Sequence, residues 1–225
     1  MLELIRIEFP KISMQKLDDM TKIVFVVLVL LLGCTEHLPK QSLLPSGSKV
    51  LILGDSLSYG TGANPGQDYP SLLTQTTGWN IVNAGVPGDT SAGGLQRLEG
   101  LLASHTPALV VIELGGNDFL RQLPIDITES NLRSALSMAK ASGAKVLLVS
   151  IPEFSPLRAV VGNLSDHPVY ERIAQDTNTP LISDVFSEVL SDRSLRADQI
   201  HPNAQGYSAV ATKMHEALRD LGYVR

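Results

Sequence analysis

Cysteine is almost absent from this chain of 225 residues, in which Cys34 is the single one. An intrachain disulfide is therefore excluded. Basic residues are also in deficit, and the formal net charge of −5 argues against nucleic acid as a partner. Histidine, cysteine and acidic residues nowhere show the spacing of a metal site, so we expect neither a metal nor a cofactor.

A long apolar run is missing too. The stretch Ile23–Leu32 has ten residues, whereas a transmembrane helix needs about 20. Such a run is typical of the central part of an export signal. It ends in Leu31-Leu32-Gly33-Cys34, which resembles the lipobox of bacterial lipoproteins, in which the cysteine becomes lipid-modified. We expect an exported lipoprotein, anchored through Cys34 to a bacterial membrane and facing the periplasm or the cell surface; the alternative is a buried strand with an incidental free cysteine.

This interpretation divides the chain into three segments. Residues 1–33 are expected to be a signal peptide, but the acidic residues of the stretch 1–19 suit no signal, so we expect translation to begin at Met14 or Met20. Residues 34–48, rich in proline, glycine and serine, are expected to be a tether. Residues 49–225 are long enough for one domain with a large core, which we expect to be a monomer.

Apolar runs alternate with helical patterns along this domain. Strands are expected at Lys49–Leu53, Trp79–Ala84, Leu109–Leu114, Lys145–Ile151 and, more weakly marked, Pro180–Ile182. Helices are expected at Tyr69–Thr77, Ser91–Ser104, Glu129–Ser142 and from Asn203 onward. Strands separated by helices pair in parallel, which predicts an α/β fold: a three-layer α/β/α sandwich with a mainly parallel five-stranded sheet.

Four polar segments fall at expected strand ends or helix starts. They are Gly54-Asp55-Ser56-Leu57-Ser58, the stretch 83–90, Gly115-Gly116-Asn117-Asp118 and Asp198-Gln199-Ile200-His201. Each taken alone has an ordinary explanation as a turn or a helix cap. In a parallel sheet, however, the first three converge on one edge, and the last loop can reach the same edge.

The residue types in these segments suit nucleophilic catalysis. Ser56 needs a base to take its proton, and His201 can be that base while Asp198 orients the imidazole through its other nitrogen. The backbone N–H groups of Ser56 and Gly88 and the side-chain amide of Asn117 are candidates for an oxyanion hole.

Together the four segments resemble the SGNH hydrolases, the GDSL esterase/lipase superfamily, over Lys49–Gly116 and Asp198–Tyr207. The similarity is greatest to the branch of the bacterial periplasmic thioesterase/protease/lysophospholipase and related arylesterases. It implies a flavodoxin-like fold and a serine esterase that hydrolyses carboxylic ester or thioester bonds through an acyl-enzyme. It also implies that Ser56, Asp198 and His201 form the triad, with Gly88 and Asn117 in the oxyanion hole.

The substrate remains open at this point. Phe119, Leu120 and Leu123 follow the Asn117 turn and either line an acyl groove or only cap the sheet. A carbohydrate O-deacetylase could use the same scaffold, although the scarcity of aromatic residues disfavours a long platform for stacking sugars. A non-catalytic, ligand-binding lipoprotein is the other alternative, and it would leave the filled catalytic positions unexplained.

Overall fold

A computed structural model of the protein describes residues 40–153 and 162–225. The expected signal peptide, Cys34 and the first part of the expected tether lie outside the described residues. The described chain contains a five-stranded sheet in which every neighbouring pair is parallel, in the order β2-β1-β3-β4-β5. The strands are β1 (Lys49–Gly54), β2 (Asn80–Gly85), β3 (Leu109–Glu113), β4 (Lys145–Val149) and β5 (Leu181–Ile182). This confirms the predicted α/β fold and its parallel sheet.

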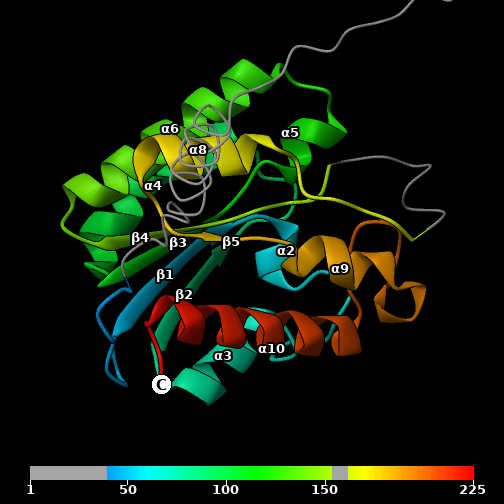
Figure 1. Ribbon diagram of the computed structural model, residues 1–225, viewed down its shortest axis with the longest axis horizontal. Helices are drawn as coiled ribbons and strands as arrows, with labels where there is room; N and C mark the ends of the chain where they lie inside the picture. The colour runs from blue at the N-terminus through cyan, green and yellow to red at the C-terminus, as the bar shows by residue number, and fades with distance from the viewer. Residues whose placement is uncertain (1–39, 154–161) are drawn as a thin grey trace, which may run out of the picture. The chain divides into compact units, whose positions relative to one another are not determined.

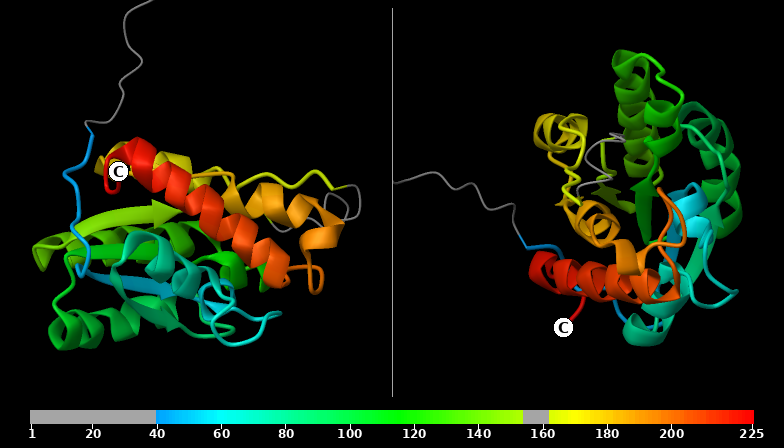
Figure 2. Two further views of the ribbon diagram at one scale, coloured as in Figure 1. Left: turned by 90° about the horizontal axis from the view of Figure 1, so that it is seen from below. Right: turned by 90° about the vertical axis from the view of Figure 1, so that its right-hand side faces the viewer.

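Helices cover both faces of the sheet (Figures 1 and 2). One layer contains α4 (Ser91–His105), α6 (Ile125–Ala141) and α8 (Val169–Thr177), with α6 packed between the other two. The opposite layer contains α3 (Tyr69–Thr77) and α10 (Ala204–Leu221), with α9 (Val185–Ser191) packed beside α10. Two short helices, α2 (Ser56–Tyr59) and α5 (Gly116–Leu120), follow β1 and β3, and a 3-10 turn, η1 (Arg193–Leu195), precedes α10.

The central strands explain why the sheet is covered on both sides. All five residues of β3 are buried, and in β1 only the first residue is exposed. Runs of valine, leucine and isoleucine without alternation are typical of strands with helices on both faces. Because all strands point the same way, their carboxyl ends meet at one edge of the sheet, where parallel α/β proteins place their sites.

Besides the short helices α2 and α5, two helices were not expected from the sequence, and one helix begins earlier than expected. Helix α6 begins at Ile125 rather than Glu129, and α8 and α9 lie in a region for which no helix was predicted. Both unexpected helices are short, and neither begins with a side-chain cap, so the usual start signals are missing. Their apolar residues are nevertheless buried in adjacent pairs one turn apart, as in Val185, Phe186, Val189 and Leu190 of α9.

The expected tether is partly packed on the domain. The N–H of Gln41 donates to the carbonyl of Leu221 at 2.7 Å, and the N–H of Leu44 donates to the carbonyl of Tyr223 at 2.9 Å. The side chain of Leu44 is 8% exposed and belongs to the hydrophobic core, and its carbonyl accepts the indole N–H of Trp79. Residues from about Gln41 onward therefore belong to the domain, and the expected boundary at residue 49 moves toward the N-terminus.

Candidate active site

Ser56 is the first residue of α2, directly beyond the carboxyl end of β1. Asp55 caps this helix, because its Oδ1 accepts a hydrogen bond from the backbone N–H of Leu57 at 2.9 Å. The strand must end in glycine, since a Cβ on Gly54 would lie 2.1 Å from Oγ of Ser58. The sequence Gly-Asp-Ser thus makes a tight strand-to-helix turn that leaves Ser56 at the edge of the sheet.

A buried polar network packs against this turn. Oγ of Ser58 lies 2.7 Å from the hydroxyl of Tyr69 and donates a hydrogen bond to Oε2 of Glu113. Burial, assisted by the negative charge of nearby Asp55, raises the pKa of Glu113 well above its usual range. The sequence reasoning missed this network; the available signal was an acidic residue at the end of an otherwise apolar strand.

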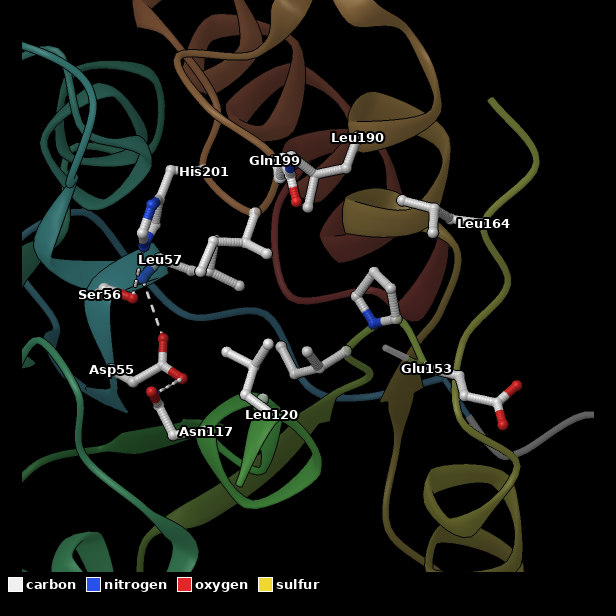
Figure 3. Close-up of a pocket in the computed structure, with 14 residues that line it drawn as sticks. Asp55, Ser56, Leu57, Asn117, Leu120, Glu153, Leu164, Leu190, Gln199 and His201 are labelled. Atoms are coloured by element: carbon white, nitrogen blue, oxygen red, sulfur yellow. Dashed lines mark hydrogen bonds between the residues drawn. The ribbon is translucent and has the colours of Figure 1, made fainter. Parts of the chain in front are cut away.

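The carboxyl edge of the sheet brings Ser56, His201 and Asp198 together. Nε2 of His201 lies 2.9 Å from Oγ of Ser56 (Figure 3). Nδ1 of His201 lies 2.7 Å from Oδ2 of Asp198. The other carboxylate oxygen of Asp198 accepts the backbone N–H groups of Ile200 and His201, both at 2.8 Å. Partial burial acts to raise the pKa of Asp198, but these hydrogen bonds outweigh it and keep the pKa below its usual value. With Asp198 ionised, Nδ1 carries the proton and Nε2 can accept one from Ser56.

The two other expected site residues lie on neighbouring turns. Asn117 is in α5, beyond the end of β3, and its Nδ2 donates to Oδ2 of Asp55 at 2.9 Å. Gly88 lies beyond the end of β2 with a φ of +81°, a conformation that favours glycine. Its carbonyl accepts a hydrogen bond of 2.7 Å from Nη2 of Arg121. Arg121 follows α5, so this contact joins the turn of Gly88 to the turn of Asn117.

A cavity extends from Ser56 and His201 across the edge of the sheet (Figure 3). Its polar end holds Ser56, Asn117 and His201, and its opposite end holds Leu164 and Leu190, which Figure 3 places far from the serine. The remaining described residues of its lining are Asp55, Leu57, Gly116, Leu120, Ile151, Pro152, Glu153, Gln199 and Ile200. Most of the lining beyond the polar end is therefore aliphatic.

Of the three loop residues for which an acyl groove and a cap on the sheet were the alternatives, one lines the cavity. Leu120 lines the cavity, but Phe119 and Leu123 do not. The ring of Phe119 is buried and stacks on that of His167, with ring centroids 4.5 Å apart, so Phe119 serves the core. Leu123 is exposed at the surface. The cavity is instead completed by residues after β4 and in α9, which lie far from Asn117 in the sequence, and local sequence reasoning had no signal for them.

The described part of the chain contains neither a cluster of metal ligands nor a membrane-spanning helix. Across residues 40–153 and 162–225, histidine, cysteine and acidic residues form no group of three that could hold a metal ion. Among these residues there is also no helix with the length and apolar character that spanning a membrane requires.

A serine hydroxyl, an imidazole and a carboxylate in hydrogen-bonding series, at the carboxyl edge of a parallel sheet, are the arrangement of a serine hydrolase. Residues 52–209 match the GDSL-like Lipase/Acylhydrolase family, and the chain belongs to this family. It is 38% identical to Thioesterase 1/protease 1/lysophospholipase L1 of Escherichia coli (strain K12) over 180 residues, covering 76% of this chain and 84% of that protein.

Two further relatives agree with this assignment. Esterase TesA of Pseudomonas aeruginosa is 38% identical over 181 residues, covering 76% of this chain and 88% of that protein. A crystal structure of TesA, 35% identical, aligns with a TM-score of 0.69 over 77% of this chain and 99% of that one. The protein is therefore an ester-bond hydrolase, a serine acyl esterase with the SGNH fold.

Proposed function

We propose that Ser56 is the nucleophile of this esterase, His201 its general base and Asp198 the residue that orients His201. The observation that carries the proposal is the unbroken series of two contacts, 2.9 Å from Ser56 to His201 and 2.7 Å from His201 to Asp198. A serine is a weak nucleophile unless a neighbouring base takes its proton during attack, and His201 is in reach to do so.

The reaction would proceed through an acyl-enzyme. Oγ of Ser56 attacks the carbonyl carbon of the ester while its proton passes to Nε2 of His201. The tetrahedral intermediate then expels the alcohol or thiol, which takes that proton from His201, and the acyl group stays on Ser56. Water attacks the acyl-enzyme with His201 again accepting the proton, which returns to Ser56 as the carboxylic acid leaves. Asp198 stays ionised throughout and stabilises the imidazolium.

The oxyanion of the tetrahedral intermediate needs fixed hydrogen-bond donors. We assign this role to the backbone N–H groups of Ser56 and Gly88 and to the side-chain amide of Asn117. Two observations support the assignment: Asn117 lines the cavity together with Ser56, and Arg121 holds the carbonyl of Gly88. One such donor typically stabilises the transition state by about 2.7–4 kcal/mol.

We propose that the substrates are esters or thioesters of acyl chains longer than acetate. The aliphatic lining between Ser56 and Leu164 suits a hydrocarbon chain, whereas an acetyl group would leave most of it unused. Relatives named thioesterase, lysophospholipase and esterase favour the same class of substrate. A deacetylase is therefore less well supported, and a non-catalytic binding protein does not agree with the family.

A series of p-nitrophenyl esters from acetate to palmitate tests this proposal. Each buried methylene is worth up to about 0.8 kcal/mol, or about fourfold in kcat/KM. We expect kcat/KM to rise with chain length until the chain reaches Leu164 and Leu190, and then to level off. The matching acyl-CoA series decides between ester and thioester preference. Highest activity on acetate would contradict the proposed substrate class and favour the deacetylase.

The variant Leu164→Trp should prefer shorter acyl chains than the wild type. Leu164 is partly exposed at the far end of the cavity, so a larger side chain can enter the cavity without disrupting the core. We expect activity on the longest esters to fall about tenfold, a loss of about 1.4 kcal/mol, while acetate is unaffected. Leu101→Trp, at a partly buried leucine of α4 outside the cavity, is the matched control and should leave the profile unchanged. An identical profile for Leu164→Trp would exclude this end of the cavity as the acyl site.

We also propose that the protein is exported, cleaved before Cys34 and anchored to a bacterial membrane by lipid on that cysteine. The support is the apolar run followed by Leu31-Leu32-Gly33-Cys34. Because the described cavity and the proposed triad come from one chain, we propose that the active form is a monomer.

Metabolic labelling tests the lipid anchor. Bacteria that express the full chain and are fed an alkynyl fatty acid should label the wild-type protein, whereas Cys34→Ser should carry no label and should leave the membrane fraction. Because Cys34 is the only cysteine, no other thiol of this chain can hold the label. Equal labelling of both proteins would contradict the proposal.

A further inference from the structure

Asp55 connects the turn of the nucleophile to the turn of the oxyanion amide. Its side chain lines the cavity, although it is only 2% exposed. Oδ1 accepts the backbone N–H of Leu57 in α2, and Oδ2 accepts Nδ2 of Asn117 in α5 at 2.9 Å (Figure 3). The turn after β3 packs closely on this carboxylate, because a Cβ on Gly116 would lie 3.3 Å from Oδ2. One buried carboxylate therefore contacts both loops.

We propose that Asp55 is a positioning residue that fixes the orientation of the Asn117 side-chain amide, so that this amide presents an N–H group to the developing oxyanion. The inference rests on the proposed role of Asn117 as an oxyanion donor. It adds a residue that acts on the reaction through Asn117.

The reason lies in which groups can donate and which can only accept. An ionised carboxylate is an acceptor only, so it binds the nitrogen end of an asparagine amide and not the oxygen end. Nδ2 of Asn117 carries two protons; Asp55 holds one, and the other stays available to the substrate. If the amide turned over, its carbonyl oxygen would face the oxyanion and repel it.

Capping of α2 does not by itself account for an acidic residue here. Burial raises the pKa of Asp55 to about 6, against the favourable hydrogen bonds from Leu57 and Asn117 and the attraction of His201. The negative charge therefore opposes folding at neutral pH. Asparagine caps helices about as well as aspartate and would carry no such charge. What asparagine cannot do is present two acceptors, one to α2 and one to Asn117.

The variant Asp55→Asn tests the proposal. Asparagine keeps the size of the side chain and an acceptor for Leu57, but it turns an NH₂ group toward Asn117, whose amide must then turn its own oxygen toward position 55. We expect kcat on p-nitrophenyl esters to fall about 10²- to 10³-fold, as for loss of one oxyanion donor. KM should change little, because the interaction is made only in the transition state.

Further variants separate positioning from general damage. Asp68→Asn is the matched control, because Asp68 is also a buried capping aspartate, accepts the N–H of Ser71 at 2.9 Å and does not line the cavity. We expect Asp68→Asn to have the kcat of the wild type. Asp55→Ser keeps a capping oxygen but is too short to hold Asn117, and should lose as much kcat as Asp55→Asn. The side-chain amide NMR signals of Asn117 should move in both Asp55 variants and stay in place in Asp68→Asn.

The double variant Asp55→Asn/Asn117→Ala decides between the outcomes. Because both substitutions remove the same interaction, the hydrogen bond from Asn117 to the oxyanion, the double variant should lose no more kcat than Asn117→Ala alone. Wild-type turnover by Asn117→Ala would refute the oxyanion role of Asn117, which belongs to the proposed function. Two outcomes would overturn the positioning role alone. In the first, Asn117→Ala has a lowered kcat while both Asp55 variants keep the wild-type kcat. In the second, the fold-loss in kcat of the double variant equals the product of the fold-losses of the two single variants.

Discussion

Replacement of Ser56 by alanine is expected to lower kcat by about 10⁶-fold, the loss seen when the nucleophile is removed from a catalytic triad. The hydroxyl both forms the acyl bond and supplies the proton that His201 takes, so no neighbouring group can replace it. KM should change little, because the cavity beyond the serine is unaltered. The measurement is hydrolysis of a p-nitrophenyl ester, together with covalent labelling by a fluorophosphonate probe and mass analysis of the labelled peptide.

The wild-type protein should carry the fluorophosphonate label on Ser56, and Ser56→Ala should not be labelled. Ser104→Ala is a suitable control, because Ser104 is an exposed serine of α4 whose hydroxyl donates to the carbonyl of Gly100. It should be labelled and should turn over like the wild type. Labelling of Ser56→Ala at the wild-type rate would remove Ser56 from the role of nucleophile.

The variant Asp198→Asn is expected to lower kcat by about 10⁴-fold, although it keeps the shape of the side chain. Its orientation is dictated by the backbone, because the N–H groups of Ile200 and His201 point at Oδ1 and require an oxygen there. The NH₂ group must then face Nδ1 of His201 and donate to it. This fixes the wrong tautomer, in which Nε2 carries the proton and cannot accept one from Ser56.

Asp192→Asn is the control for this change. Asp192 is exposed, and its Oδ1 likewise accepts a backbone N–H and a hydroxyl, both from Ser194. It lies outside the described lining of the cavity, so kcat should be unchanged. Should Asp198→Asn retain more than about one hundredth of wild-type kcat, orientation of His201 by Asp198 would not be part of the mechanism.

The sheet could be predicted because its strands are recognisable from the local sequence. The strands β1 and β3 are short runs of valine, leucine and isoleucine with polar turns at their ends, and such runs are typical of strands buried on both faces. Helices α8 and α9 were missed because they are short and lack side-chain caps. Their burial depends on contacts with α6 and α10, which no local pattern contains.

The polar end of the site was predictable for a related reason. Ser56 and Asn117 follow strands, and parallel pairing brings the ends of neighbouring strands together. The apolar end was not predictable, because Leu164 and Leu190 come from separate parts of the chain that meet only after folding. Phe119 adjoins Asn117 in the sequence, which left a place in the groove and a place capping the sheet both open. The turn of α5 directs it to the core, where it stacks on His167.

The sequence by itself determined the parallel α/β architecture and which polar residues follow the strands, because apolar runs and residue types are local properties. Only the tertiary structure decided how Asp55 is used. Its two oxygens receive donors from α2 and α5, and the second donor, Asn117, is 62 residues away in the chain. The shape of the cavity was likewise decided by tertiary packing, since side chains from distant segments fill or leave open the space beside Ser56.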